Sequence, residues 1–223
     1  MTAIMTLKNV TKIYKTGDED TVALDKISLE IQQGEFVAIM GPSGSGNSSL
    51  MHIIGLLDTS TSGSYCLNNQ DVSKLTSAKQ AEIRNNEIGF VFQQFNLLPR
   101  TSVTDNILLP TIYGKIENPE KRANELADEV GLGDKKHNKS NQLSGGQIQR
   151  VAVARALVMN PSIILADEPT GNLDTKTSAE IMNLFKEINK KGATIVLITH
   201  EEDIAKYADR IIHLRDGKIV KEK

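Results

Sequence analysis

The sequence is poor in two features that would indicate particular classes of protein. Its 223 residues include one cysteine, Cys66, so no disulfide can form within the chain, in keeping with a reducing cytosol. It also lacks an excess of basic residues, with 26 Lys+Arg against 28 Asp+Glu. A protein that binds duplex DNA usually shows a strong basic bias or a basic stripe. We therefore expect no nucleic-acid partner.

Long apolar runs are missing as well. The start, MTAIMTLKNVTKIYK, has no apolar signal core, and no run reaches the roughly 18 apolar residues that would span a bilayer. If the protein works at a membrane, another chain must hold it there. The length suits one large domain, or one domain with a small inserted lobe, and is sufficient to bury a core.

The two ends of the chain alternate in ways typical of strands and helices. IMTLKNVTKIY and DKISLEIQQGEFVAIM predict strands, and the apolar run Phe36–Met40 is typical of a central parallel strand. SSLMHIIGLL then has helical spacing, with Leu50, Ile53, Ile54 and Leu57 on one face. The last third alternates strand and helix and ends in a predicted hairpin with Asp216-Gly217 as its turn. This alternation predicts an α/β fold with a mostly parallel sheet.

The middle third is predicted to be more helical. TSAKQAEIRNN predicts a short polar helix, and NPEKRANELADEVGL predicts another, with Asn118 as N-cap and Gly131 at its end. We expect this region to form a separate helical lobe.

The stretch GPSGSGNSS nearly fits the phosphate-binding template Gly-x-x-x-x-Gly-Lys-[Ser/Thr], but it lacks the lysine. It follows a predicted strand and opens a predicted helix, which is the placement that the template requires. The alternative is a Gly/Ser-rich turn that binds nothing. The candidate nucleotide-binding residues here are Gly41, Pro42, Ser43, Gly44, Ser45, Gly46, Asn47, Ser48 and Ser49.

Most of this loop does not depend on the side chain at position 47. Backbone N–H groups around Gly44 to Ser49, with the helix N-terminus near Ser48, can converge on phosphates. The Ser48 hydroxyl can contact Mg²⁺. Asn47 is neutral and shorter than lysine, so we expect its amide to miss the β and γ phosphate oxygens. Binding is then expected to survive better than turnover.

Acidic and histidine side chains follow two later predicted strands. Asp167 and Glu168 end the buried strand of IILADE, where open α/β sheets bind ligands. Asp167 can hold Mg²⁺ and Glu168 can polarise an attacking water, although a solvated acidic pair is the alternative. His200 ends ATIVLITH in the same way, which favours a γ-phosphate contact over a purely structural role.

The segment LSGGQIQR, Leu143 to Arg150, places a serine and two glycines at the start of a predicted helix. This makes a second anion-binding helix N-terminus. One chain with a single phosphate-binding loop does not need two such cradles. Two copies arranged head to tail would use both, so that a two-fold dimer contains two composite sites.

Together these motifs resemble the nucleotide-binding subunits of ABC transporters over essentially the whole chain. In this resemblance Gly41–Ser49 is similar to Walker A except at Asn47, Leu143–Gln147 to the signature, and Ile163–Asp167 with Glu168 to Walker B and the catalytic carboxylate.

Shorter motifs extend the resemblance. Gln93 in FVFQQFNLLP is similar to the Q-loop glutamine, and GNLD, Gly171–Asp174, to the D-loop. His200 is similar to the switch histidine, and Tyr14 in VTKIYK to the aromatic residue that stacks on adenine.

The resemblance implies ATP and Mg²⁺ as cofactors and transport-coupled ATP hydrolysis as the activity. It implies a P-loop NTPase core of about residues 1–92 and 160–223, with an N-terminal antiparallel β subdomain, and a helical lobe of about 93–159. It further implies catalytic roles for Glu168, His200 and Gln93, metal contacts at Ser48, Gln93 and Asp167, and nucleotide contacts beyond the P-loop at Tyr14, Ser144, Gly145, Gly146, Gln147 and Asp174.

MHIIGLLD, IGFVFQQFNLLP and LADEPTGNLD resemble one branch of the family, which serves macrolide export, lipoprotein release and antimicrobial-peptide resistance. This resemblance implies a transmembrane permease, a second copy of the chain and an adaptor in the periplasm or elsewhere outside the cytoplasm as partners. The chain would sit on the cytoplasmic face of the membrane.

Phe95, Leu97 and Leu98 are candidates for the permease-docking groove, with ordinary packing as the alternative. Ile148 departs from the usual polar residue, with a small expected effect.

Several readings of the sequence remain. The first is an ATP-driven subunit that closes and opens with nucleotide. The second is a natural ATP-binding regulator that does not hydrolyse. The third is a working ATPase whose lysine was replaced by Asn47, which the intact Tyr14, Gln93, Glu168 and His200 favour over the second. A soluble ABC ATPase of DNA repair or translation is disfavoured, because such chains carry long coiled-coil insertions or tandem domains.

Overall fold

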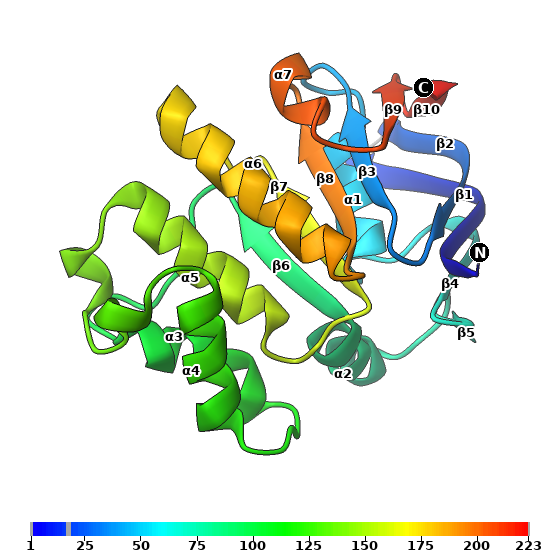
Figure 1. The fold of residues 1–223 in the computed structure, drawn as a ribbon. Coiled ribbons are helices and arrows are strands. Elements are labelled where there is room, and N and C mark those ends of the chain that lie inside the picture. Colours follow the sequence, from blue (N-terminus) through cyan, green and yellow to red (C-terminus); the bar gives the residue numbers. More distant parts are fainter. Residues whose placement is uncertain (1, 17–18, 223) are drawn as a thin grey trace. The chain divides into compact units, whose positions relative to one another are not determined.

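The computed structural model describes residues 2–16 and 19–222. The chain divides into two compact units. We call residues 1–81 with 189–223 the first unit, and residues 82–188 the second unit. Figure 1 shows the elements of both units coloured along the sequence. Each unit is described by itself below.

An antiparallel sheet forms the N-terminal part of the first unit. Its order is β2-β1-β4-β5. In β2 the buried residues Ile27, Leu29 and Ile31 alternate with exposed ones, the period-two pattern of a strand with one face against a core. The strands are β1 (Ala3–Thr16), β2 (Glu19–Gln32), β4 (Ser62–Leu67) and β5 (Gln70–Asp71).

A mostly parallel group of strands holds the rest of the first unit. β3 (Phe36–Met40) pairs in parallel with β8 (Thr194–Thr199) and with β9 (Arg210–Arg215). Every residue of β3 and of β8 is buried, because these strands are covered on both faces. β10 (Lys218–Glu222) pairs antiparallel with β9. The predicted Asp216-Gly217 turn is confirmed, with φ of 49° and 72° at the two residues.

Two helices of the first unit follow β3 and β8. α1 (Asn47–Ile54) begins after Gly46 and buries Leu50, Ile53 and Ile54, as its spacing predicted. Leu57 does not share that face, since the helix ends at Ile54 and the Leu57 side chain is 47% exposed. α7 (Glu202–Ala205) is a short helix of four residues.

The second unit contains a parallel strand pair and a group of helices. β6 (Ile88–Phe92) and β7 (Ile163–Asp167) pair in parallel. α3, α4 and α5 contact one another, as Figure 1 shows. The helices are α3 (Val103–Leu108), α4 (Pro119–Glu129) and α5 (Gly145–Leu157), with 3₁₀ turns at Leu109–Ile112, Gly133–Lys135 and Ser140–Gln142; α2 (Ser77–Glu87) and α6 (Thr175–Lys190) each extend across a unit boundary.

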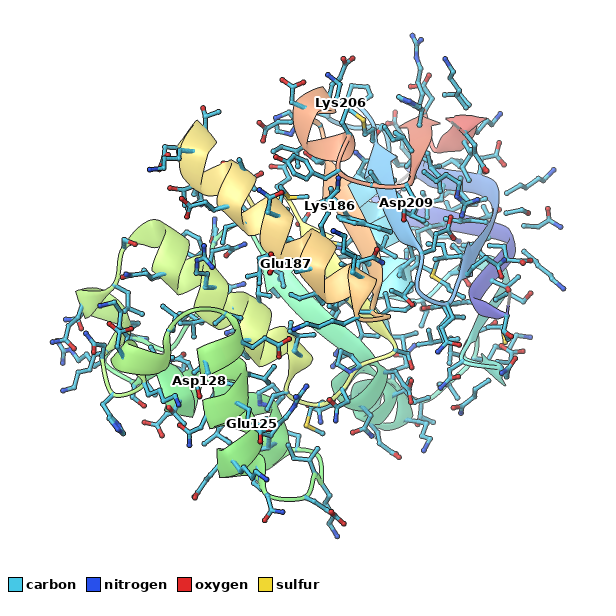
Figure 2. All side chains as sticks on the ribbon, viewed as in Figure 1. Glu125, Asp128, Lys186, Glu187, Lys206 and Asp209 are labelled. Atoms are coloured by element: carbon cyan, nitrogen blue, oxygen red, sulfur yellow. The ribbon has the colours of Figure 1, made fainter. Side chains whose placement is uncertain are left out.

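Helix α4 shows how these helices form a core. Its buried residues Ala123, Leu126 and Ala127 lie on one face, while the exposed Glu125 and Asp128 project from the helix, as Figure 2 shows. Asn118 precedes the helix as predicted, but it has φ of 48° and makes no side-chain cap. The three helices lie within the predicted lobe of residues 93–159, whose bounds remain a prediction.

The α/β class, with a mostly parallel sheet and an antiparallel N-terminal sheet, is confirmed. Across residues 2–16 and 19–222, no helix combines the length and apolarity that crossing a membrane requires.

Candidate functional site

The loop Gly41–Ser49 of the first unit is tightly folded at its two ends. A Cβ on Gly41 would lie 2.4 Å from the Leu214 carbonyl oxygen, and one on Gly46 would lie 2.6 Å from the Ala23 carbonyl oxygen. Gly46 also has φ of 104°, which a side chain disfavours. These two positions therefore require glycine for steric reasons, which explains two fixed residues of the template.

The middle of the same loop is open. A Cβ built on Gly44, which has φ of 81°, would meet no atom within 4 Å. Pro42, Ser43 and Gly44 are exposed. Ser48, in the first turn of α1, is exposed as well. An open turn beside a helix N-terminus fits the phosphates of a nucleotide, because backbone N–H groups and the helix dipole favour anions.

Asn47 turns its amide toward its own loop. Its Nδ2 donates to the Gly41 carbonyl oxygen at 3.1 Å. Its Oδ1 is buried and, among the described residues, has no hydrogen-bond partner; the same is true of the Ser45 hydroxyl. The amide that replaces the lysine ammonium of the template is thus bonded to the base of the loop.

His200 and Tyr14 are the other candidate residues of the first unit. Thr199 of β8 pairs with Met40 of β3, so His200 and Gly41 leave neighbouring parallel strands at the same edge. His200 is exposed there. Tyr14 lies near the end of β1, half-buried, and its hydroxyl donates to Asp58 Oδ2 at 3.0 Å.

In the second unit, the carboxyl ends of β6 and β7 bring three candidate residues to one edge. Phe92 pairs with Asp167, so Gln93 follows one strand where Asp167 and Glu168 end the other. Glu168 has φ of 42°. A left-handed backbone at a glutamate is strained, and such strain is concentrated at functional sites. This edge can therefore present carboxylates and an amide to one ligand.

The segment Gly171–Asp174 is fastened to this edge. Asn172 Nδ2 donates to the Gln93 carbonyl oxygen at 2.8 Å, and a Cβ on Gly171 would lie 2.5 Å from Gln93 Nε2. Asp174 accepts from the Thr177 N–H at 3.0 Å and from its hydroxyl at 2.6 Å, at the start of α6. These bonds from Thr177 hold the pKa of Asp174 below its ordinary value.

The signature segment begins α5, as expected. Ser144 is the N-cap: its hydroxyl accepts from the Gln147 N–H at 3.4 Å, and Gln147 Oε1 accepts from the Ser144 N–H at 3.0 Å. This is a capping box, which the Ser-x-x-Gln spacing would have revealed. A Cβ on Gly146 would lie 2.4 Å from Thr177 Cγ2, so a larger residue at this position would require the Thr177 side chain to move. Ser144 and Gly145 are exposed.

Sequence reasoning missed Arg155 of α5. Its guanidinium donates to the Phe95 carbonyl oxygen at 2.9 Å and to that of Asn96. Phe95 and Asn96 both have left-handed backbone, with φ of 59° and 50°. Burial lowers the pKa of Arg155. An arginine inside the apolar run VAVARAL was the available signal, because a buried guanidinium requires acceptors.

A second missed residue, Asn106, holds the far end of the same loop. Its buried side chain accepts from the Leu98 N–H at 2.8 Å and donates to the Ser102 carbonyl oxygen at 2.9 Å. Leu98, a docking candidate, is 48% exposed, while Phe95 and Leu97 are half-buried.

Each unit contains residue types that can bind a magnesium nucleotide. Among the described residues, no group of three or more His, Cys, Asp and Glu is placed to hold a metal ion. Magnesium in nucleotide sites is bound by one or two protein groups together with phosphates and water, so a dedicated cluster is not required. Ser48 of the first unit, and Gln93 and Asp167 of the second, each carry a side-chain oxygen of the kind that magnesium prefers.

Comparison with known proteins identifies the same family that the motifs indicate. The family description "ABC transporter" matches residues 24–171. The chain is 54% identical to the "Uncharacterized ABC transporter ATP-binding protein YvrO" of Bacillus subtilis (strain 168), over 97% of this chain and 96% of that protein. It is 52% identical to the "Macrolide export ATP-binding/permease protein MacB" of Bdellovibrio bacteriovorus (strain ATCC 15356 / DSM 50701 / NCIMB 9529 / HD100), over 96% of this chain but only 33% of that protein.

Comparison with solved structures supports the same family. The "Dimeric structure of a post-hydrolysis state of the ATP-binding cassette MJ0796 bound to ADP and Pi" superposes with a TM-score of 0.87 and 47% identity, covering 98% of this chain and 97% of that one. The cassettes of this family are transport-coupled ATPases that bind ATP with Mg²⁺. The predicted family, fold and cofactors are thus confirmed: the chain belongs to the ABC transporter family, as an ATP-binding cassette.

Proposed function

We propose that two copies of this chain bind two MgATP head to tail and power a membrane transporter of the export or mechanotransmission type. The observation that carries the proposal is the presence of two exposed, glycine-rich helix N-termini, at α1 and at α5, each suited to phosphate. One nucleotide needs only one P-loop. A second phosphate-binding helix start is explained if it closes the nucleotide of another copy. The solved relative is described as dimeric, which supports the pairing of two copies.

Each candidate residue has a role in this arrangement. Tyr14 would stack on adenine, and the P-loop would hold the phosphates. Ser48, Asp167 and Gln93 would hold Mg²⁺, which neutralises charge on the phosphates when bound. Glu168 would orient and polarise the attacking water, and His200 would contact the γ-phosphate.

Elements of the partner copy complete each site in the proposal. Ser144, Gly145, Gly146 and Gln147 would donate to the γ-phosphate bound by the other copy. Asp174 would lie at the same junction. The Ser144 hydroxyl can do this while capping its helix, since it accepts from the Gln147 N–H and its own proton remains available to a phosphate.

We further propose that Asn47 weakens nucleotide binding and impairs hydrolysis. Its amide is neutral, and its Nδ2 is bonded to the Gly41 carbonyl oxygen. A charge-assisted hydrogen bond contributes about 1.5–3 kcal/mol, so its loss lowers affinity on the order of ten- to a hundredfold. Loss of a preorganised donor to the transition state costs about a hundred- to a thousandfold in rate.

The test compares the chain with its Asn47→Lys variant, and with Asn47→Gln as the matched control. Glutamine lengthens the side chain without adding charge. We expect lysine to raise MgATP turnover at least about tenfold and glutamine to leave it near the parent value. Turnover would be measured by phosphate release and affinity by calorimetry. Equal turnover of the parent and the lysine variant would refute the role given to Asn47.

The second candidate function is an ATP-binding regulatory subunit that does not hydrolyse. The bond between Asn47 and Gly41 favours it, because this bond gives the loop a defined conformation without lysine. The two candidates differ in one result. A regulator should respond to MgATP, for example by dimerising, at concentrations where its turnover is undetectable.

The transmembrane partner is also a proposal. The MacB relatives carry "ATP-binding/permease" in their names, and this chain spans about a third of their length. We propose that the cassette works with a transmembrane permease at the cytoplasmic face of the membrane, and that an adaptor outside the cytoplasm belongs to the same assembly. Phe95, Leu97 and Leu98, on the loop held by Arg155 and Asn106, are proposed to contact the permease.

A further inference from the structure

The Tyr14 side chain is held by two charged residues that no motif assigns. Its hydroxyl donates to Asp58 Oδ2 at 3.0 Å. The other oxygen of the same carboxylate, Asp58 Oδ1, accepts from Lys12 Nζ at 2.7 Å. Lys12 Nζ also donates to the Thr59 carbonyl oxygen at 2.8 Å and lies 4.8 Å from the centre of the Tyr14 ring. We call Lys12, Tyr14 and Asp58 the ring clamp.

The ring clamp joins β1 to the end of the P-loop helix. Asp58 follows α1, and its N–H donates to the His52 carbonyl oxygen at 3.1 Å, which fixes it to the last turn of that helix. The Thr59 N–H donates to Asp58 Oδ1 at 2.7 Å. The other end of α1 is the phosphate-binding loop. A helix is a rigid spacer with a rise of about 1.5 Å per residue, so Asp58 sets the distance between the ring and the loop.

Charge and burial are consistent with a fixed geometry. The Lys12 side chain is 11% exposed and that of Asp58 is 29% exposed. Burial works to raise the pKa of Asp58, but the bonds from Lys12, Thr59 and Tyr14 outweigh it and hold that pKa below its ordinary value. The carboxylate is therefore ionised at neutral pH, and it accepts three hydrogen bonds, one from each of these residues.

Lys12 also determines which face of the ring a base can use. An ammonium over an aromatic face is attracted by the π electrons and occupies that face. A planar ligand that stacks on Tyr14 must then use the opposite face. The bond to Asp58 therefore restricts the rotation of the Tyr14 ring, and Lys12 leaves only one face of the ring open to a base.

We propose that Asp58 and Lys12 are positioning residues that orient the Tyr14 ring at a fixed distance from the P-loop, so that it selects a nucleotide base. The inference rests on the proposed role of Tyr14 as the adenine contact. It makes a distinct claim, because stacking alone requires only an aromatic ring, whereas the ring clamp requires the hydroxyl and the carboxylate.

The experiment measures binding of two probes, MgATP and magnesium tripolyphosphate, which has the phosphates but no base. All chains are full length and carry Asn47→Lys, so that phosphate binding is strong enough to measure. The variants are Tyr14→Phe, which keeps the ring and removes the hydroxyl; Asp58→Ala, which removes the carboxylate; Tyr14→Leu, which removes the ring; and Asp58→Asn, which keeps an acceptor for the hydroxyl. Tyr113→Phe, at an 85% exposed tyrosine, is the matched control.

We expect Tyr14→Phe and Asp58→Ala each to weaken MgATP binding by about three- to tenfold, with tripolyphosphate binding unchanged. Combining the two should be no worse than Asp58→Ala alone, because the bond that Tyr14→Phe removes is already absent from Asp58→Ala. Asp58→Asn should recover part of the loss, and Tyr113→Phe should match the chain that carries Asn47→Lys alone. A purely structural role would not separate the two probes.

Three results would overturn the inference. If Tyr14→Phe binds MgATP as strongly as Asn47→Lys alone while Tyr14→Leu does not, the ring stacks without needing its clamp. If Tyr14→Leu also binds as strongly as Asn47→Lys alone, the role of Tyr14 in the proposed function fails as well. If a variant loses affinity equally for both probes, the ring clamp acts on the whole fold and not on base recognition.

Discussion

At the scale of single residues, Glu168 has a strained backbone conformation and lies at the strand edge where a ligand would bind. Its φ of 42° costs about 1–3 kcal/mol, and it follows β7 at the edge where Gln93 leaves β6. The proposed function explains why such a conformation is retained. In that proposal, the conformation would direct the Glu168 carboxylate toward the attacking water.

We predict that Glu168→Gln, made together with Asn47→Lys, lowers turnover on the order of a hundredfold or more while MgATP affinity changes little. The amide keeps the shape of the side chain but cannot accept a proton, and general base catalysis contributes about 10²–10⁴-fold. Phosphate release and calorimetry would measure the two quantities. Glu187→Gln, at an exposed position of α6, is the control and should change neither. A turnover within a few-fold of Asn47→Lys alone would remove Glu168 from the catalytic role.

Asp58 gives a prediction for pH. Its folded pKa lies below the ordinary value of 3.8, because bonds from Lys12, Thr59 and Tyr14 outweigh its burial. A depressed acid pKa stabilises the fold above the unfolded pKa, and that contribution is lost as pH falls through the folded value. We therefore expect the free energy of unfolding of the parent to fall more steeply below about pH 4 than that of Asp58→Asn. Urea unfolding at a series of pH values would show it.

Asp20→Asn is the matched control for that series, since Asp20 is an exposed acid of β2. It should follow the parent more closely than Asp58→Asn does. Parallel curves for the parent and Asp58→Asn would mean that the bonds at Asp58 add no stability.

Single motif residues could be predicted from the sequence, but their contacts could not. The template located Gly41, Gly46 and Ser48 because their spacing is local. The bond between Asn47 and Gly41 depends on the detailed course of the loop. The bond between Tyr14 and Asp58 joins positions 44 residues apart, on a strand and after a helix, and no local pattern encodes such a pair.

At the scale of elements, the start of α5 gives two roles to one residue, Ser144. Ser144 caps the helix, and in the proposed function it also donates to a phosphate. These demands can be separated, because aspartate is as good an N-cap as serine while its negative charge repels a phosphate.

We predict that Ser144→Ala lowers stability by about 0.5–2 kcal/mol, and that Ser144→Asp stays near the parent in stability. Both should reduce MgATP turnover in the Asn47→Lys background, the aspartate more strongly. Thermal unfolding and phosphate release would be measured on the same samples. If Ser144→Asp hydrolyses ATP as fast as Asn47→Lys alone, the start of α5 does not contact phosphate.

Elements buried on both faces were predicted well, and element ends were not. The apolar runs of β3, β7 and β8 are short, and each begins two residues after a glycine or a proline, which favours buried strands over helices. Leu57 was placed on α1 by its spacing, but Gly55 ends the helix. The left-handed turn at Phe95 and Asn96 was also missed, because Arg155, 60 residues away from Phe95, holds it.

At the scale of the whole molecule, the central claim concerns two copies. The P-loop belongs to the first unit and the signature to the second, and in the proposed function each nucleotide uses the P-loop of one copy with the signature of the other. This claim can be tested by mixing two chains, each defective in a different element.

The parent chain has an intact signature and a P-loop with Asn47. A second chain, carrying Asn47→Lys and Ser144→Asp, has a restored P-loop and a defective signature. Neither can build a complete site with a copy of itself.

A mixed dimer would contain one complete site, formed by the P-loop of the second chain and the signature of the parent. The most direct measurement is MgATP turnover of the equimolar mixture. The proposal predicts about a quarter of the Asn47→Lys turnover, since about half of randomly formed dimers are mixed and each has one complete site of two. Turnover no higher than the average of the two chains measured separately would contradict a head-to-tail arrangement.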